Sequence, residues 1–325
     1  MNNPQTLQST LQLDAVWRQS FQASLESRGK SDQTQVSYLQ DMKAFAEWFL
    51  TENGEEFRPE LVNSWDLRAY RTWCLEVARL SPATWNRRRA TLLVFCRWAR
   101  KQGHIQTDPM EDIPAYEMVA QAPRWLEKNE FGKVMRQLEL NLNMANTPAR
   151  KERACRDGAV MALLTNAGLR VSEVCDLQVG DIELSDKRGR VTVRLGKGQK
   201  QREIPLNSEA RSWLSTWLKY HGQMKRECIL FPNYDGTQLT TRAVEKRVAQ
   251  IGAQAGVIGL IPHRLRHTCA KRMIDSGAPL TAVQRVLGHS KIETTARYAM
   301  AGWEDIEEAV EGVILGKSRR TATHG

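Results

Sequence analysis

The spacing of apolar residues in the first hundred positions predicts a group of helices. From position 31 the apolar residues recur at helical spacing, namely Val36, Leu39, Met42, Phe45 and Phe49. Ser31 or Asp32 can cap this helix, and Asn53-Gly54 ends it. The same period predicts helices over 64–80 and 81–102, the last opened by a Ser-Pro pair and closed by a glycine.

Three prolines then interrupt the pattern and predict an extended linker between two domains. Pro109, Pro114 and Pro123 fall in a stretch without periodicity. We therefore predict a helical N-terminal domain over 1–108, a linker over 109–123 and a C-terminal domain over 124–325.

The C-terminal domain is predicted to be helical with one small antiparallel sheet. Helices are expected from 128 and then over 155–167, 172–177, 208–221, 241–255, 264–276, 279–287, 292–299 and 303–314. The expected strands are 190–195 and 201–205, joined by a Gly-Lys-Gly turn, and the polar stretch 143–154 is expected to be a loop. The fold class is thus mainly α with a small antiparallel β-sheet.

Composition narrows the functional class. The chain has 325 residues, of which 41% are hydrophobic and 26% charged, as in globular proteins and unlike disordered or fibrous chains. The longest apolar run, 159–164, is far shorter than a membrane span, and the N-terminus does not resemble a secretory signal. Six scattered cysteines without a CxxC pair argue against disulfides and a cysteine zinc site. We expect a cytoplasmic protein without a membrane partner.

The charge is concentrated in the second domain. Residues 1–122 carry 14 basic and 15 acidic groups, whereas residues 123–325 carry 33 and 22. A domain this basic suits a polyanion partner, although charge alone fits plain solubility equally well. The near-neutral first domain still has one basic helix, whose candidate DNA-binding residues are Arg87, Arg88, Arg89, Arg97, Arg100 and Lys101.

Several polar residues of the second domain could form a reactive site. They are Arg170, Lys197, His263, Arg266, His289 and Tyr298. Each has an ordinary structural reading, since an arginine or histidine at a helix end can cap it and a lysine in a turn is usually solvated. Their order along the chain and the sequences around them favour a functional role, because both resemble those of a known protein family.

Four segments of the second domain resemble the tyrosine recombinases, also called the phage integrase family. The matching segments read TNAGLRVSEVCDLQVGDI, GKGQKQREIPL, HRLRHTCAKRMIDSG and LGHSKIETTARYAM, in the family's order. The segment TWNRRRATLLVFCRWARKQG is similar to the end of the family's core-binding domain. The resemblance implies a helical core-binding domain followed by an α+β catalytic domain. The short leading segment is typical of Xer-like members without an arm-binding domain.

The resemblance also implies an active site. Tyr298 would be the nucleophile, with the catalytic residues Arg170, Lys197, His263, Arg266 and His289 around it, and Glu173 in support. Lys200 and Lys291 are less suitable alternatives to Lys197. The phenol oxygen would attack a DNA phosphodiester and form a 3′-phosphotyrosyl link, while the two arginines bind the phosphate oxygens. His263 would act as the base, Lys197 as the acid, and His289 as a hydrogen-bond donor.

No carboxylate cluster accompanies these residues, so we expect neither a metal nor a cofactor. The expected partner is double-stranded DNA, bound by a homotetramer on two sites or together with a related recombinase, with accessory DNA-bending proteins as further candidates. An amphipathic last helix, 303–314, would dock on a neighbouring protomer.

Two other functions are compatible with the same sequence. A type IB topoisomerase would nick and reseal one strand without a partner protomer, and a non-catalytic DNA-binding module would keep the fold alone. The expected basic loop at 143–154 departs from Xer proteins and leaves room for a mobile-element enzyme. For each of these functions the partner is DNA, so we expect the protein at the bacterial nucleoid.

Overall fold

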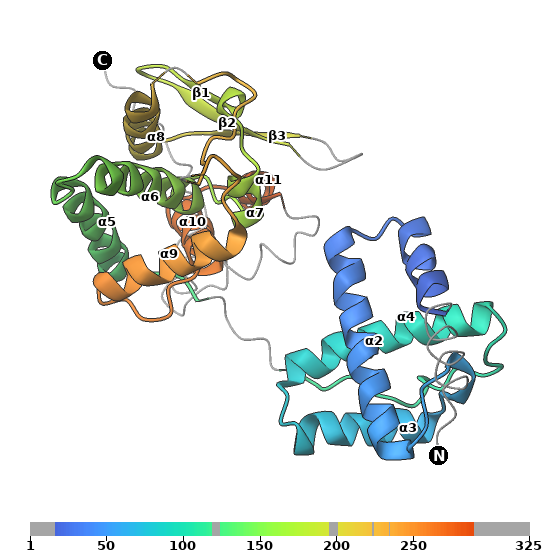
Figure 1. The fold of residues 1–325 in the computed structure, drawn as a ribbon. Coiled ribbons are helices and arrows are strands. Elements are labelled where there is room, and N and C mark those ends of the chain that lie inside the picture. The colour runs from blue at the N-terminus through green and yellow to red at the C-terminus, as the bar shows by residue number, and fades with distance from the viewer. Residues whose placement is uncertain (1–16, 119–123, 195–200, 223, 234, 289–325) are drawn as a thin grey trace, which may run out of the picture. The chain divides into compact units, whose positions relative to one another are not determined.

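The structure is a computed structural model that describes residues 17–118, 124–194, 201–222, 224–233 and 235–288 (Figure 1). The chain divides into two compact units, residues 1–120 and 121–325. The described part of the first unit is helical, and the second adds a three-stranded antiparallel sheet to its helices. The predicted fold class is confirmed.

The first unit consists of helices around an aromatic core. Residues 17–27 are helical, and the chain continues through α2 (Asp32–Asn53), a 3₁₀ turn (Pro59–Leu61), α3 (Ser64–Thr72), a π-helical turn (Trp73–Val77) and α4 (Pro82–Lys101). The side chains of Ser31 and Ser81 accept hydrogen bonds from backbone N–H groups in the first turns of α2 and α4, as predicted. The core includes the fully buried rings Phe21, Phe45, Trp85, Phe95 and Trp98.

Part of the predicted linker belongs to this unit. Met110 and Ile113 are buried in its core, and the carbonyl of Ile113 accepts a 2.6 Å hydrogen bond from Arg89 Nε. Asn86 and Tyr116 exchange two hydrogen bonds of 2.9 and 2.8 Å. The prolines keep this segment non-helical without detaching it, because its apolar side chains pack on α4. The expectation of an extended linker from residue 109 is therefore corrected.

The second unit contains seven helices in its described part and a small sheet. The helices are α5 (Lys128–Asn143), α6 (Pro148–Asn166), α7 (Val171–Cys175), α8 (Ser208–His221), α9 (Thr241–Gln254), α10 (Pro262–Asp275) and α11 (Leu280–Leu287). A 3₁₀ turn (Val179–Asp181) precedes the strands β1 (Ile182–Leu184), β2 (Gly189–Val193) and β3 (Arg202–Pro205), which pair in sequence order. Val191 faces both Ile182 of β1 and Ile204 of β3 in this register. Of these three strands, β1 was not predicted from the sequence.

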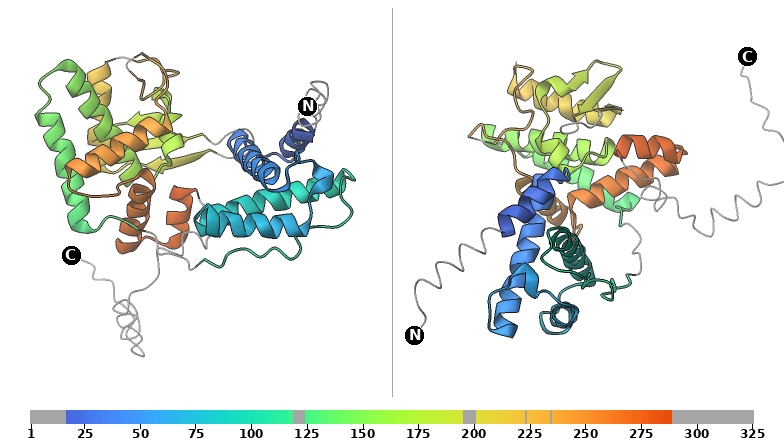
Figure 2. Two further views of the ribbon diagram at one scale, coloured as in Figure 1. Left: turned by 60° about the horizontal axis from the view of Figure 1, so that its bottom comes forward. Right: turned by 90° about the vertical axis from the view of Figure 1, so that its right-hand side faces the viewer.

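The centre of the second unit is α6. Eleven of its 19 residues are buried, and it contacts α5, α8 and α10, lying between α8 and α10 in Figures 1 and 2. Gly158 permits the close approach of α8, because a Cβ there would lie only 2.0 Å from the ring of Trp213. The C-terminal end of this helix leads the chain to Arg170, one of the predicted site residues.

The expectation of a loop over 143–154 is wrong. Only residues 144–147 separate α5 from α6, and Thr147 caps α6 through the backbone N–H of Arg150. Residues 148–151 form the exposed first turn of the helix and so show no apolar period. The expected departure from Xer proteins rested on this loop and therefore loses its basis.

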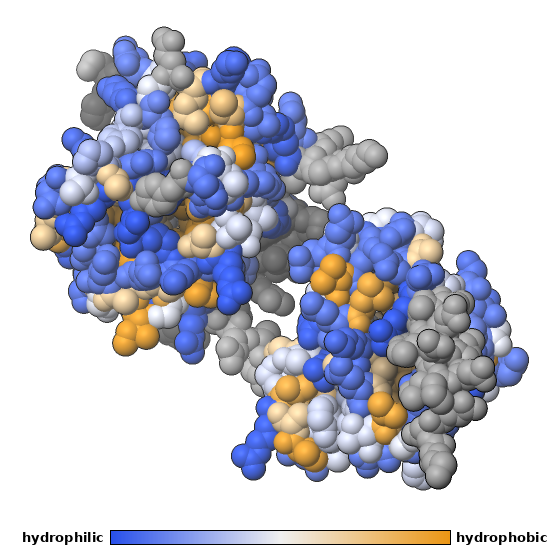
Figure 3. All heavy atoms as spheres, viewed as in Figure 1, coloured by the Kyte–Doolittle hydropathy of each residue, from blue (hydrophilic) through white to orange (hydrophobic). Residues whose placement is uncertain are grey.

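The outer surface is mainly polar on the face that Figure 3 displays. The large apolar side chains that are exposed in the described residues are scattered, and they include Trp65, Val77, Met144, Ile258 and Ile261. Scattered residues of this kind are ordinary on a protein surface. Within the described ranges, no helix combines the length and the apolar composition that crossing a bilayer requires.

Candidate active site

Four of the predicted site residues meet where several helices of the second unit end or begin. Arg170 precedes α7, Glu173 lies on α7, and His263 and Arg266 lie in the first turns of α10. A pocket of about 440 Å³ opens here, and its lining includes Arg170, His263 and Arg266. Residues almost a hundred positions apart therefore contribute to one cavity.

Arg266 is held by the ends of two helices. Its side chain is buried, and its Nη1 and Nη2 atoms donate hydrogen bonds to the carbonyl oxygens of Gly168 and Leu287. These carbonyls belong to the segments that close α6 and α11, where the helix dipole favours a cation. The guanidinium is thus fixed at the pocket wall by the protein itself.

Arg170 is more exposed and belongs to a network of charges. Its Nη1 donates to Glu173 Oε1 at 2.8 Å, and its Nη2 donates to the carbonyl of Gly288 at 3.1 Å. The arginine side chain is 44% exposed, whereas that of Glu173 is only 10% exposed. This arrangement leaves part of the guanidinium accessible from the pocket.

Arg202, which the sequence analysis did not select, completes this network. It pairs with both carboxylate oxygens of Glu173 at 2.9 and 2.8 Å. Burial alone would raise the pKa of Glu173, but the hydrogen bonds from Arg202 and the backbone of Arg170, with both positive charges, hold that pKa below its ordinary value. Arg202 stands in the quoted segment GKGQKQREIPL, yet no spacing distinguishes it from exposed strand arginines such as Arg190.

His263 is suited to accept a proton. Burial lowers its pKa below the ordinary imidazole value, and the charges of Arg266 and Arg170 lower it further. Its ring lies edge-on to that of His267, with centroids 4.2 Å apart. The imidazole is therefore neutral at pH 7 and has a nitrogen lone pair available.

The other predicted catalytic residues, Lys197, His289 and Tyr298, lie outside the described residues, as do Lys200, Lys291 and the predicted docking helix 303–314. The structure thus brings together four of the seven predicted residues, namely Arg170, Glu173, His263 and Arg266, and adds Arg202.

The candidate DNA-binding residues on α4 fall into two groups. Arg87 donates to buried Asp41 at 2.6 Å, Arg88 donates to the Tyr70 hydroxyl at 2.6 Å, and Arg89 binds the Ile113 carbonyl. Arg97, Arg100 and Lys101 are exposed. The first group is therefore tied to other parts of the first unit, although the Arg87 side chain is still half exposed, while the second group is presented to solvent.

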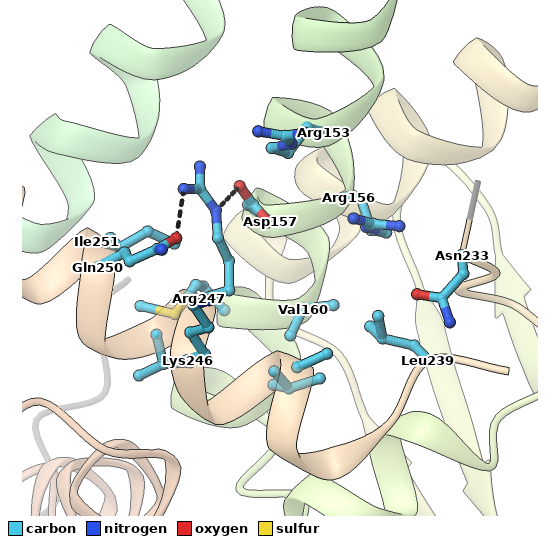
Figure 4. Close-up of a pocket in the computed structure, with 14 residues that line it drawn as sticks. Arg153, Arg156, Asp157, Val160, Asn233, Leu239, Lys246, Arg247, Gln250 and Ile251 are labelled. Atoms are coloured by element: carbon cyan, nitrogen blue, oxygen red, sulfur yellow. Dashed lines mark hydrogen bonds and ion pairs between the residues drawn. The ribbon is translucent and has the colours of Figure 1, made fainter.

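A second pocket, of about 340 Å³, lies between α6 and α9 (Figure 4). Its floor is apolar, and Arg247 spans it, donating from Nε to buried Asp157 at 2.6 Å and from Nη1 to Gln250 at 3.2 Å. Burial raises the pKa of Asp157 even though the Arg247 charge opposes the shift.

In the part of the chain that the structure describes, no cluster of three or more His, Cys, Asp or Glu side chains could bind a metal ion.

Comparisons with known protein families cover most of the chain. The model of the phage integrase family matches residues 126–303, and that of the phage integrase N-terminal SAM-like domain matches residues 17–104. The chain belongs to the phage integrase family. Membership in this family confirms the predicted resemblance.

Similar proteins of this family are tyrosine recombinases. Tyrosine recombinase XerC of Corynebacterium glutamicum is 32% identical over 285 residues, which cover 86% of this chain and 85% of that protein. Tyrosine recombinase XerD of Lacticaseibacillus casei is 32% identical over 280 residues, covering 83% and 88%. This phage integrase family member is therefore a tyrosine-type site-specific recombinase.

The fold agrees with this assignment. The crystal structure of the XerH site-specific recombinase bound to its palindromic difH substrate, a post-cleavage complex, aligns with a TM-score of 0.70. The alignment covers 89% of this chain and 84% of XerH, at 22% sequence identity. At that identity the likeness shows a shared fold.

Proposed function

We propose that this recombinase cuts and rejoins double-stranded DNA through a 3′-phosphotyrosyl intermediate on Tyr298. The observation that carries the proposal is the meeting of Arg170, Arg266 and a neutral His263 around one pocket. Two guanidinium groups and a proton acceptor are what an attack of a phenol on a phosphodiester requires. The relatives are named tyrosine recombinases, which supports a tyrosine as the nucleophile.

The proposed reaction balances without a further reactant. The Tyr298 oxygen forms a bond to phosphorus while its proton passes to His263, and the bond to the 5′ oxygen breaks. Lys197 gives that oxygen a proton, so a 5′-hydroxyl leaves. Rejoining reverses the steps, with a 5′-hydroxyl as the nucleophile and the phenol as the leaving group. Arg170 and Arg266 stabilise the charge on the non-bridging oxygens throughout, and His289 adds a hydrogen bond.

We further propose that four protomers assemble on two DNA sites. The first unit would act as the core-binding domain, with Arg97, Arg100 and Lys101 contacting phosphates, and the second as the catalytic domain. The segment 303–314 would dock on a neighbouring protomer. A related recombinase could replace some protomers, and DNA-bending proteins could assist assembly at the nucleoid.

The test of the nucleophile is a Tyr298→Phe variant on a nicked duplex that traps cleavage. We expect the wild-type protein to form a covalent adduct, seen as a slower band under denaturing conditions, and the variant to form none while still binding the duplex. Tyr220→Phe is the control, because the Tyr220 hydroxyl binds the carbonyl of Pro148 on α6. An adduct at the wild-type level in Tyr298→Phe would refute the proposal.

The topoisomerase alternative has a separate test. A recombinase needs recognition sites and a four-protomer complex, so mass measurement of the complex with two-site DNA should give four chains. Relaxation of a supercoiled plasmid that lacks any recognition site, by single protomers, would favour the topoisomerase.

A further inference from the structure

Arg202 joins three segments of the candidate active site. It is the first residue of β3, and its side chain is only 9% exposed. Nη1 and Nη2 donate to Glu173 on α7, and Nε donates to the carbonyl of Val286 on α11 at 3.0 Å. It also lies against the end of α11, since a Cβ built on Gly288 would be 3.0 Å from Arg202 Nη1. One buried guanidinium therefore connects β3, α7 and α11.

The Glu173 carboxylate is shared evenly between two arginines. Oε1 accepts from Arg170 Nη1 at 2.8 Å and from Arg202 Nη1 at 2.9 Å. Oε2 accepts from the backbone N–H of Arg170 at 2.7 Å and from Arg202 Nη2 at 2.8 Å. Both oxygens thus receive one bond from each arginine, and the carboxylate is fixed in position and rotation.

The charges of the three residues determine how strongly Arg170 can bind a phosphate. Two guanidinium groups and one carboxylate leave one net positive charge. Without Arg202, the buried carboxylate would pair with Arg170 alone, and this pair would be neutral. Because a neutral pair attracts an anion far less than a free cation does, Arg170 would lose much of its affinity for a phosphate oxygen.

We propose that Arg202 is a positioning residue for strand cleavage: it offsets the charge of Glu173 and holds this carboxylate in place, so that Arg170 remains available to the scissile phosphate. This inference rests on the proposed function. Arg202 is almost fully buried and, like Glu173, does not line the pocket. It acts on the reaction only through Glu173 and Arg170.

A purely structural role is the alternative. A buried ion pair is weak evidence for net stability, and breaking one by removing a partner destabilises a protein wherever the pair lies. The experiment must therefore separate lost folding from lost positioning. The pair of Arg247 and Asp157 provides the matched control, because Asp157 is also buried and paired with an arginine in the same unit, on the α6–α9 side (Figure 4).

The experiment compares Arg202→Met, Arg202→Lys, Glu173→Gln/Arg202→Met and Arg247→Met in the full chain. Thermal unfolding, affinity for the duplex and the single-turnover rate of adduct formation are measured, the last at saturating protein and below all unfolding transitions. We expect Arg202→Met to slow adduct formation by roughly 10- to 100-fold, as misplaced catalytic groups do, with little change in duplex affinity. Arg247→Met should lose thermal stability and keep the wild-type rate.

Two further variants test the charge argument. Glu173→Gln in the Arg202→Met background removes the uncompensated carboxylate and should recover part of the lost rate. Arg202→Lys restores a cation and should also be faster than Arg202→Met. Either an unchanged rate in Arg202→Met, or a slow rate that neither Glu173→Gln nor the lysine improves, would overturn the inference. If the wild-type protein forms no Tyr298-dependent adduct, the proposed function itself fails.

Discussion

Replacing Gly168 with alanine perturbs the short segment that connects α6 to Arg170 in the candidate active site. Gly168 has a φ of +61°, and a Cβ there would lie 2.8 Å from Leu287 Cδ2 and 3.2 Å from Cys269 Sγ. Both neighbours are buried, so they have little room to move. The carbonyl of Gly168 also accepts a hydrogen bond from Arg266. The substitution therefore strains the backbone, the packing and the hydrogen bond of Arg266, the proposed catalytic arginine.

The expected loss of stability has two parts. A left-handed conformation costs an alanine about 1–2 kcal/mol, and an extra methyl group in a packed interior costs about 1–3 kcal/mol. The sum is about 2–5 kcal/mol in the free energy of unfolding. In a unit of this size each kcal/mol lowers Tm by about 2–4 °C, so we expect a fall of roughly 4–20 °C.

Scanning calorimetry of the full chain measures the effect, with Gly256→Ala as the control. Gly256 has a φ of +69°, but nothing lies within 4 Å of the position its Cβ would take. The control should show only the backbone cost, about 1–2 kcal/mol. Equal decreases of Tm in the two variants would refute the packing argument. The rate of adduct formation should fall in Gly168→Ala and stay unchanged in Gly256→Ala.

Three further outcomes follow from the described contacts. Burial and the charges of Arg266 and Arg170 lower the pKa of His263. The rate of adduct formation should therefore be insensitive to pH around 7 and fall on the acid side, as the imidazole is protonated. A rate that rises between pH 7 and 5 would contradict the role of His263 as the base. Arg266→Lys should reduce both Tm and the adduct rate, since one ammonium group cannot reach two carbonyls as a guanidinium does, and a lost charged hydrogen bond costs about 1.5–3 kcal/mol. Arg97→Gln should weaken duplex binding and reduce the slope of log affinity against log salt concentration by about 1, with Tm unchanged. Arg88→Gln should instead lower Tm, because Arg88 binds the Tyr70 hydroxyl. The reverse pattern in binding and melting experiments would show that the two groups on α4 were assigned wrongly.

Local signals in the sequence were enough to predict most helices. Ser31 and Ser81 cap α2 and α4 as expected, because a cap depends on residues within one helical turn. The first two turns of α6, residues 148–154, were missed, since most of these residues are exposed and only the following turns show an apolar pattern. Strand β1 has three residues, too few for an alternating pattern to be recognised.

The candidate site was predictable only through the family resemblance. Arg170, Glu173, His263 and Arg266 stand in motifs, and the structure places them together. The role of Arg202 depends on contacts with residues 29 and 84 positions away, which no local pattern encodes. The same holds for Arg88, whose partner Tyr70 lies on another helix.

The burial of α6 limits how this enzyme can change its length in evolution. One residue inserted into a helix turns everything beyond it by about 100° and advances it by about 1.5 Å. An insertion between Ala154 and Thr165 would therefore rotate Gly168 and Arg170 away from α10, and it would also expose the apolar face that α6 packs against its neighbours. Insertions and deletions among relatives should accordingly fall in the short connection 144–147, at the other end of the helix. A change of length there leaves Arg170 in its position next to α10.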